Sequence, residues 1–561
     1  MHKTILALAA VAAGGAAASI ASERTAGEAG TVYGGAIVDQ DWGRPLASGD
    51  LDGDGFDEVI VGASESFGGV VSEVYVIRGG PDAHQLGTID LSLGGSDHVI
   101  LGAMVDDNLG SSIATGDVNG DGVDDLLICA STADFSTLAD RGIAYLIFGG
   151  PTFFNSATRD LSVAGSWDFR ILGPVAGGDM GGANLFGGLD AHAAAIGRLN
   201  NDIYGDMILG VHLADGGAGE SGRVYVVFGG PFVSGFTANL SGGAGNVRIN
   251  GAGSLDELGT VVLAGDLTGD GLDELILPNE YASEGLFTSE GRVHIFRGRA
   301  SWPTTINLNS TAADITLLGA REDDNLGSAA AVGDFNNDGV MDLVTAAPGA
   351  DAGVLNDQRG DGFVYGLLGS AAYQTGAHTI DYLTATPDFQ LIGEFEENLG
   401  VELSAGDFNA DGIDDIAASE RFAGPQTNGV VEVVYGRAFS AGATFTANVD
   451  TNLRIVGAAQ DRIGFSLAAG NVNGDGRDEI LFGTPFNNSN HGTAYVFTHT
   501  TSDYDDDGDI DADDAATFYG CMLGPDVAHA DGDPCRAADD DADTDVDLHD
   551  LAALQIAFTG P

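Results

Sequence analysis

The feature that most constrains this chain is a unit that recurs seven times between residues 31 and 499. Each unit contains an apolar run closed by a glycine, an acidic stretch that ends in a hydrophobic residue and a second glycine, an Asp-rich loop, and two further apolar runs. The first glycines are Gly35, Gly102, Gly173, Gly251, Gly319, Gly393 and Gly457, and the second are Gly43, Gly110, Gly187, Gly259, Gly327, Gly400 and Gly464. Such internal self-similarity indicates one repeat architecture rather than several unrelated domains.

The apolar runs predict about four β-strands in each unit. Continuous runs such as 126–128 suit strands that are buried on both faces, and alternating runs such as 144–148 follow them. One four-stranded sheet cannot bury both faces, whereas seven sheets arranged radially cover one another and leave only short edges. We therefore predict an all-β fold, a seven-bladed β-propeller over residues 31–499. An open β-solenoid or a string of small sandwiches is the alternative, and the lack of linkers between the units favours the closed ring.

The strongly acidic composition restricts the partners of this chain. Asp and Glu number 84 against 21 Lys and Arg, which gives a formal net charge of -63. This charge argues against nucleic acid or an anionic membrane as a partner, and its self-repulsion weakens a compact state unless cations offset it. Because 44% of the residues are hydrophobic, the chain can still build cores. The composition therefore predicts a folded protein that attracts cations.

The Asp-rich loops indicate calcium binding. Ca²⁺ prefers six to eight oxygen ligands, and a tight loop supplies them from carboxylates at alternate positions with a glycine at the turn. The predicted ligands are Asp50, Asp52, Asp54 and Glu58; Asp117, Asn119, Asp121 and Asp125; Asp266, Thr268, Asp270 and Glu274; Asp334, Asn336, Asp338 and Asp342; Asp407, Asn409, Asp411 and Asp415; and Asn471, Asn473, Asp475 and Glu479. A single such turn is weak evidence, since Asp, Asn and Gly favour turns for local reasons. Six corresponding loops predict Ca²⁺ as a structural cofactor.

Two of the seven loops depart from this pattern. The last has only two carboxylates, Asp475 and Glu479, so we expect it to bind calcium most weakly. The third begins with Arg198, and we expect it to have lost calcium. Its guanidinium is predicted to replace the cation by pairing with Asp202 or Asp206.

The units resemble the FG-GAP repeats of integrin α-chain propellers. Asn108-Leu109-Gly110 matches the first half of that signature, and Ala346-Ala347-Pro348 matches the second. The resemblance covers residues 31–499 and implies adhesion or binding of an extracellular protein or glycan ligand. The chain departs from integrin α-chains in having more candidate calcium loops and in lacking recognisable leg domains or a membrane-spanning segment, so a receptor that signals across a membrane is not implied.

Residues 503–561 form a second, different acidic segment. Two loops with alternate carboxylates each precede a run with helical apolar spacing. The predicted ligands are Asp503, Asp505, Asp507, Asp509 and Asp514, and Asp539, Asp541, Asp543, Asp545 and Asp550. The pair resembles a dockerin, a small α-helical module of tandem EF-hand-type loops, which implies attachment to a cohesin-like partner. The alternative is an acidic calcium-dependent tail without a dedicated receptor.

The N-terminal residues 1–22 are expected to direct export. A basic start, a short apolar run and small residues near 16–18 are typical of a signal peptide. A membrane anchor is the alternative, but the run is shorter than the ~20 apolar residues that span a bilayer. We therefore expect a secreted or cell-surface protein, in which Cys521 and Cys535 can form a disulfide, while Cys129 lies in an apolar run and is expected in the core.

No catalytic motif is recognisable in the sequence. The 11 histidines fall at no repeated ligand spacing, and there is no nucleophile elbow, no zinc-protease motif and no phosphate-binding loop. We therefore predict a non-enzymatic adhesion or interaction protein. A lectin-like carbohydrate binder and a component of polysaccharide degradation are the alternatives, with Trp42, Trp167 and Trp302 either stacking on sugars or packing in the protein.

Overall fold

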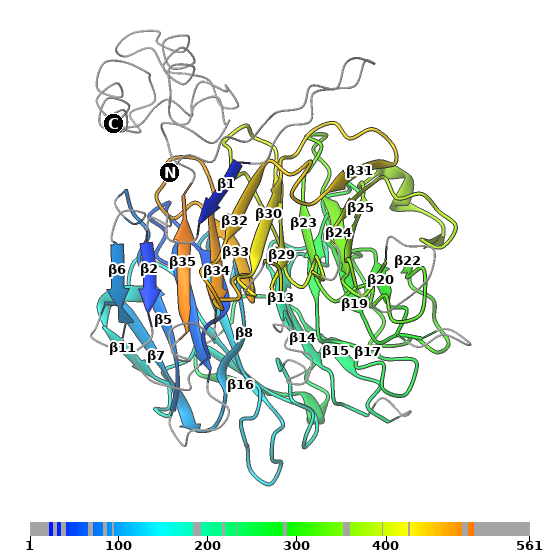
Figure 1. Cartoon of the computed structure of the whole chain (residues 1–561). Coiled ribbons are helices and arrows are strands. Elements are labelled where there is room, and N and C mark those ends of the chain that lie inside the picture. Colours follow the sequence, from blue (N-terminus) through cyan, green and yellow to red (C-terminus); the bar gives the residue numbers. More distant parts are fainter. Residues whose placement is uncertain are drawn as a thin grey trace, which may run out of the picture.

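The structure is a seven-bladed ring of β-sheets. The computed structural model describes residues 22–25, 31–34, 41–64 and 71–498, the last range with gaps at 82, 84–86, 92–94, 183–191, 216–218, 233, 284–288, 352–359, 395–396, 425–426 and 485–491. Over these residues it forms seven five-stranded sheets arranged radially (Figure 1). The predicted all-β, seven-bladed propeller is confirmed. Within the described ranges the helices are short 3-10 turns, η4 (Phe153–Asn155), η5 (Leu240–Gly242) and η6 (Ala371–Gln374).

The first two strands of each blade flank the Asp-rich loop. The innermost strands of blades 1 to 7 are β3 (Asp41–Gly49), β8 (Leu109–Gly116), β13 (Ala194–Gly197), β18 (Leu263–Gly265), β23 (Ala330–Gly333), β28 (Leu403–Gly406) and β33 (Ser466–Gly470). The second strands are β4 (Glu58–Ser64), β9 (Asp125–Ala130), β14 (Asp206–Val211), β19 (Glu274–Asn279), β24 (Asp342–Ala347), β29 (Asp415–Glu420) and β34 (Glu479–Thr484). Every residue of β9 is buried, as expected for a continuous apolar run between two other layers.

The third and fourth strands complete the predicted blade. The third strands are β5 (Val71–Ile77), β10 (Ile143–Ile147), β15 (Arg223–Val227), β20 (Arg292–Phe296), β25 (Phe363–Leu367), β30 (Val430–Val434) and β35 (Thr493–Phe497). The fourth strands are β7 (His98–Val105), β12 (Phe169–Leu172), β17 (Val247–Asn250), β22 (Ile315–Leu318), β27 (Phe389–Ile392), β32 (Leu453–Val456) and, in blade 7, β2 (Thr31–Gly34). Neighbouring strands among these four pair antiparallel, so the Asp-rich loops share one end of the ring.

Each blade also has a fifth, outermost strand, where four strands were predicted from the sequence. The chain between the third and fourth strands of one blade returns to the preceding blade and pairs in parallel with its fourth strand, as β11 does with β7. These outer strands are β11 (Thr158–Asp160), β16 (Phe236–Asn239), β21 (Thr305–Asn307), β26 (His378–Asp381), β31 (Ala443–Thr446), β1 (Ser22–Thr25) and β6 (Gly87–Asp90). They cover the outer edges and link adjacent blades.

The ring closes through its N-terminal strand. β2 pairs antiparallel with β35, with Val32 opposite Tyr495, and so completes the last blade (Figure 1). The sequence unit begins with a fourth strand, whereas a blade begins with its innermost strand. The first fourth strand of the chain therefore belongs to blade 7, and residues distant in sequence are joined by backbone hydrogen bonds.

Hydrophobic cores lie between adjacent blades. One cluster joins Ile60 and Val74 of blade 1 with Ile128 and Tyr145 of blade 2. Trp167 is buried in this cluster, and Trp302 is partly buried in another with its indole nitrogen 2.9 Å from the Leu199 carbonyl oxygen. Both are packing residues, whereas the side chain of Trp42 lies outside the described part. Cys129 is buried as predicted, and burial raises the pKa of its thiol to about 12.

Candidate metal centre

The Asp-rich loops share one backbone design across the ring. Eight residues connect the innermost strand to the second strand, from position 1 (Asp50 in blade 1) to position 8 (Asp57), and position 9 (Glu58) is the first residue of the second strand. Position 2 is an almost fully buried apolar residue in every copy: Leu51, Val118, Leu199, Leu267, Phe335, Phe408 and Val472. The position 1 carboxylate accepts hydrogen bonds from the next backbone N–H groups, as Asp50 does from Gly53, Asp54 and Gly55 at 2.8, 3.1 and 3.0 Å. This local arrangement wraps the loop around its first side chain.

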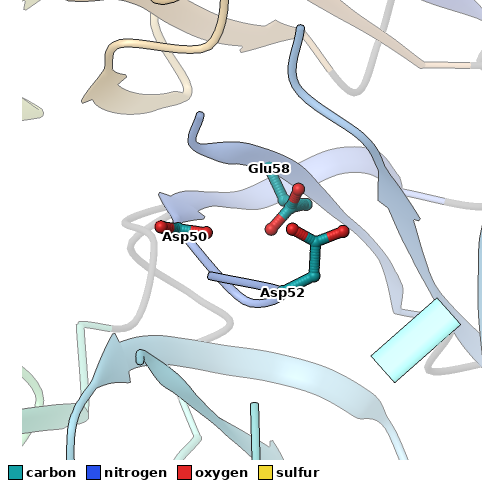
Figure 2. Close-up of side chains that lie close together, drawn as sticks. All are labelled: Asp50, Asp52 and Glu58. Atoms are coloured by element: carbon teal, nitrogen blue, oxygen red, sulfur yellow. The ribbon is translucent and has the colours of Figure 1, made fainter. Parts of the chain in front are cut away.

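The first loop brings three carboxylates together. One oxygen each of Asp50, Asp52 and Glu58 lies within 4.8 Å of the others, and Figure 2 shows the three side chains converging. Glu58 Oε2 accepts a 2.6 Å hydrogen bond from the Leu51 N–H. Glu58 Oε1 and Asp52 Oδ1 are buried and find no hydrogen-bond donor among the described residues. Two buried, unpaired carboxylate oxygens in a converging set fit the ligand requirements of a divalent cation.

Electrostatics in this loop are unfavourable for carboxylates alone. Burial, together with the charges of Asp52, Asp54 and Asp50, raises the pKa of Glu58 to about 8. Burial likewise raises the pKa of the position 9 acid in the other loops, to about 7 for Asp125, Asp206 and Asp342 and about 8 for Glu274. Each of these side chains is fully buried. A bound cation would stabilise their charged forms.

Every other loop has Asn or Thr at position 3, where the first has Asp52. Among the described residues, the first loop holds the only group of three His, Cys, Asp or Glu side chains whose ligand atoms lie within 4.8 Å of one another. In blades 2 and 7 the amide of the position 3 Asn donates to the position 9 carboxylate, from Asn119 to Asp125 at 3.0 Å and from Asn473 to Glu479 at 2.7 Å. In blade 6 Asn409 donates instead to Asp411 at 3.2 Å. The predicted ligands of each site therefore belong to the same loop, but several of them are engaged in hydrogen bonds within the protein.

The prediction for Arg198 in the third loop is wrong. Its guanidinium donates to the Gly271 carbonyl oxygen of the blade 4 loop at 2.5 Å, and within the described residues it makes no ion pair with Asp202 or Asp206. Asp206 instead accepts hydrogen bonds from the Leu199 and Gly229 N–H groups and the Asn200 amide. Backbone N–H donors therefore offset the cost of burying the Asp206 carboxylate, and the sequence pattern does not reveal these donors.

The seven loops are joined to one another in a ring. The position 8 N–H of each loop donates to the position 1 carbonyl oxygen of the preceding blade, in the pairs Asp57 to Asn471, Asp124 to Asp50, Gly205 to Asp117, Asp273 to Arg198, Met341 to Asp266, Asp414 to Asp334 and Asp478 to Asp407. Four position 8 carboxylates also accept the position 1 N–H, among them Asp414 from Asp334 at 2.7 Å. Position 8 was not among the predicted site residues, although its recurring Asp was the available signal.

A second polar cluster joins distant blades at the innermost strands. His192 Nε2 lies 3.0 Å from Glu402 Oε2. His192 precedes β13 and Glu402 precedes β28, so this contact links blades 3 and 6. Glu280 in blade 4 is almost fully buried, and burial raises its pKa to about 8. Tyr281 and Arg421 lower this pKa, whereas the charges of Glu257 and Glu402 raise it. Glu280 therefore keeps its proton at neutral pH.

The raised pKa of Glu280 predicts a pH-dependent stability. An acid whose pKa is higher in the folded than in the unfolded state stabilises the fold below its unfolded pKa, and this contribution is lost as pH rises toward about 8. The loss approaches about 1.4 kcal/mol per pH unit in that window. Glu280→Gln should unfold at a higher temperature than the wild type at pH 8.5 and differ little at pH 5. Thermal melts at both pH values test this, with exposed Glu322→Gln as control, and equal shifts for the two variants would contradict it.

Several predicted features lie outside the described residues. Residues 1–21, most of the predicted signal peptide, are among them, as is the whole predicted module 503–561 with Cys521 and Cys535. The α-helical dockerin-like domain therefore has no structural support. No helix in the described ranges has the length and apolar character needed to cross a membrane.

Comparisons with known proteins identify the repeat. The family model "FG-GAP repeat" matches residues 42–77, 109–147, 326–367 and 463–497, each running from the innermost to the third strand of a blade. Phosphatidylinositol-glycan-specific phospholipase D of Rattus norvegicus is 34% identical over 184 residues, which cover 32% of this chain and 20% of that protein. Integrin alpha pat-2 of Caenorhabditis briggsae is 26% identical over 234 residues, covering 41% and 18%. The chain thus matches about a fifth of the length of these relatives.

These matches correct the prediction that the protein is not an enzyme. A relative with similar sequence is named a phospholipase D, so the lack of a recognisable catalytic motif does not exclude an enzyme. The solved structure of rhamnogalacturonan lyase YesW aligns with 84% of this chain and 91% of the lyase chain, with 11% sequence identity and a TM-score of 0.29. This level of similarity supports no conclusion about function. Fold and repeat are established independently of activity: the chain is a seven-bladed β-propeller that carries FG-GAP repeats.

Proposed function

We propose that this protein is an extracellular interaction module whose propeller is stabilised by Ca²⁺. The observation that carries the proposal is the first Asp-rich loop, where Asp52 and Glu58 each have a buried carboxylate oxygen without a donor among the described residues. Asp50, Asp52 and Glu58 would hold the ion, with Asp54 nearby. Bound Ca²⁺ supplies positive charge to clustered carboxylates whose repulsion otherwise opposes folding.

The interaction role is supported by the fold and by the relatives. A propeller presents the loops between its strands as a rigid surface, and loops on rigid scaffolds commonly carry binding sites. One relative is named as an integrin α-chain. We propose an extracellular protein or glycan ligand for the propeller, with export directed by residues 1–22. Residues 503–561 are proposed to bind Ca²⁺ and a cohesin-like partner, with a Cys521–Cys535 disulfide between their two loops.

The second candidate function is a lectin-like carbohydrate binder, either alone or as a component of polysaccharide degradation. A pocket between blades 4 and 5, lined by aromatic and polar side chains, favours it. In this case the repeats act as a scaffold for a sugar site, and Ca²⁺ retains its structural role.

Calcium titration of the full chain tests the proposed metal centre. Glu58→Gln removes one charged ligand from the first loop and should weaken that site by tenfold or more, because calcium affinity follows ligand charge. Isothermal titration calorimetry measures the number of sites and their affinities. Asp202→Asn is the matched control, since it removes a carboxylate from the third loop, where no calcium is expected. Identical titrations of wild type and Glu58→Gln would reject a calcium site in the first loop.

A further inference from the structure

A pocket of about 350 Å³ lies between blades 4 and 5, at residues other than the Asp-rich loops. It is formed by the connection between β22 and β23, the residues shortly after β24, the strands β25 and β27, and the segment that follows β26. Its volume is at the lower end of the ~300 to 1,000 Å³ typical of small-molecule sites. The pocket therefore suits a ligand of one or two small rings.

One part of the pocket is aromatic. The rings of Tyr365 and Tyr382 stack with centroids 4.4 Å apart and planes at 13°, and Phe363 stacks on Tyr365 at 5.6 Å. Phe363 is partly buried, whereas both tyrosines are largely buried. The three side chains hold one another in place, which gives the pocket a rigid, flat apolar lining.

Tyr382 differs from its counterparts in the other blades. It immediately follows the outermost strand, and the corresponding described residues are Leu91, Leu161, Leu240, Leu308 and Ala447. The backbone is equivalent, since the N–H of Leu161, Leu308, Tyr382 and Ala447 each donates to the fourth strand of the preceding blade or the residue that ends it. Among the described copies of this position, only Tyr382 carries a hydroxyl.

The hydroxyl of Tyr382 has no hydrogen-bond partner in the part of the chain that the structure describes. The side chain is 8% exposed and lines the pocket. A buried polar group left unpaired costs about 1 to 3 kcal/mol, and leucine would avoid this cost. A ligand that hydrogen-bonds the hydroxyl explains why a polar group stands at an otherwise aliphatic position.

The rest of the pocket offers both donors and acceptors. Arg321, Asp324, Asp351 and Gln390 line it. Asp324 Oδ2 accepts a hydrogen bond from the backbone N–H of Arg321 at 2.8 Å. The Gln390 side-chain amide donates to Thr444 Oγ1 at 3.1 Å. These bonds fix the orientation of the Asp324 and Gln390 side chains. Burial raises the pKa of Asp324 to about 7, with Arg321 opposing and Asp351 adding to this shift. Because the lining has one arginine and two acidic side chains, it lacks the excess of positive charge that would favour an acidic ligand.

We propose that this pocket binds a neutral sugar ring. A pyranose has C–H faces that pack on aromatic rings and hydroxyls that both donate and accept hydrogen bonds around its edge. The aromatic lining would take one face, and the Tyr382 hydroxyl with the polar side chains would take the edge. This inference rests on the proposed interaction role of the propeller and gives it a site and a ligand class.

The test uses the full chain on an array of immobilised neutral, amino and acidic oligosaccharides, followed by titration with the methyl glycoside of the sugar retained. Tyr382→Phe removes only the hydroxyl and should weaken binding about tenfold. Tyr382→Leu installs the residue of the other blades and should abolish binding while the melting temperature stays equal or rises. Tyr225→Phe, at the third-strand position of blade 3 that corresponds to Tyr365, is the control and should bind like the wild type.

The outcomes separate this site from the proposed calcium role. Retention of no neutral glycan, retention of acidic or amino sugars alone, or undiminished binding by Tyr382→Leu overturns the sugar pocket. Melting of the same preparations with and without chelator reports the calcium role independently. Calcium-dependent melting without glycan binding therefore refutes only the pocket, whereas glycan binding without calcium-dependent melting refutes only the metal centre.

Discussion

Removal of calcium should lower the thermal stability of the propeller more than removal of any single side chain. A ligand that binds only the folded state at 100 times its Kd stabilises that state by about 2.7 kcal/mol per site. Several filled loops would contribute together, because the position 8 hydrogen bonds join each loop to its neighbour, as Asp124 to Asp50. Chelation should therefore produce a large fall in melting temperature.

Differential scanning calorimetry in millimolar calcium and in excess EDTA measures this effect. Sodium chloride at matched ionic strength controls for simple screening, which also weakens carboxylate repulsion. Addition of calcium after chelation should restore the original transition. The same melting temperature in calcium and in EDTA would show that the Asp-rich loops are stabilised by protein hydrogen bonds alone.

Gly319→Ala should be among the most destabilising single substitutions in the chain. Gly319 follows β22, and a Cβ placed on it would lie 1.7 Å from the carbonyl oxygen of Glu290. No rotamer change relieves a clash with backbone, so the end of β22 and the segment that leads into β20 must move apart. Overpacking of this kind costs about 3 kcal/mol.

Gly230→Ala is the matched control for this prediction. A Cβ on Gly230 would meet no atom within 4 Å in the part of the chain that the structure describes, and its φ lies outside the left-handed region. Its effect should stay within about 0.5 kcal/mol. Urea unfolding midpoints compare the two variants. Equal midpoints would contradict the steric requirement for glycine at position 319.

The sequence alone predicted the local elements closely. The run 144–148 overlaps the strand β10, and 126–128 lies within fully buried β9. These elements are readable because strand alternation and burial act over a few neighbouring residues. Seven copies without linkers were also enough to predict closure into a ring.

The candidate site could be predicted from the sequence only in part, because neighbouring residues determine only some of its geometry. The predicted ligands at positions 1, 3, 5 and 9 lie in each predicted loop, since chain connectivity alone brings them near one another. Which oxygens converge depends on backbone donors, as at Glu58, and on the Asn at position 3, as at Asn119. The bond from Arg198 to Gly271 joins two blades, and no pattern within one loop predicts it.

The repeat number, the strand positions and the acidic loops were therefore determined by the sequence, because each depends on residues close together in the chain. Only the tertiary structure decided the rest. The fifth strand of every blade, the pairing of β2 with β35 and the pocket at Tyr382 all join segments far apart in sequence. Such contacts form only where the closed ring brings two blades side by side, and the residues involved carry no periodic signal of their own.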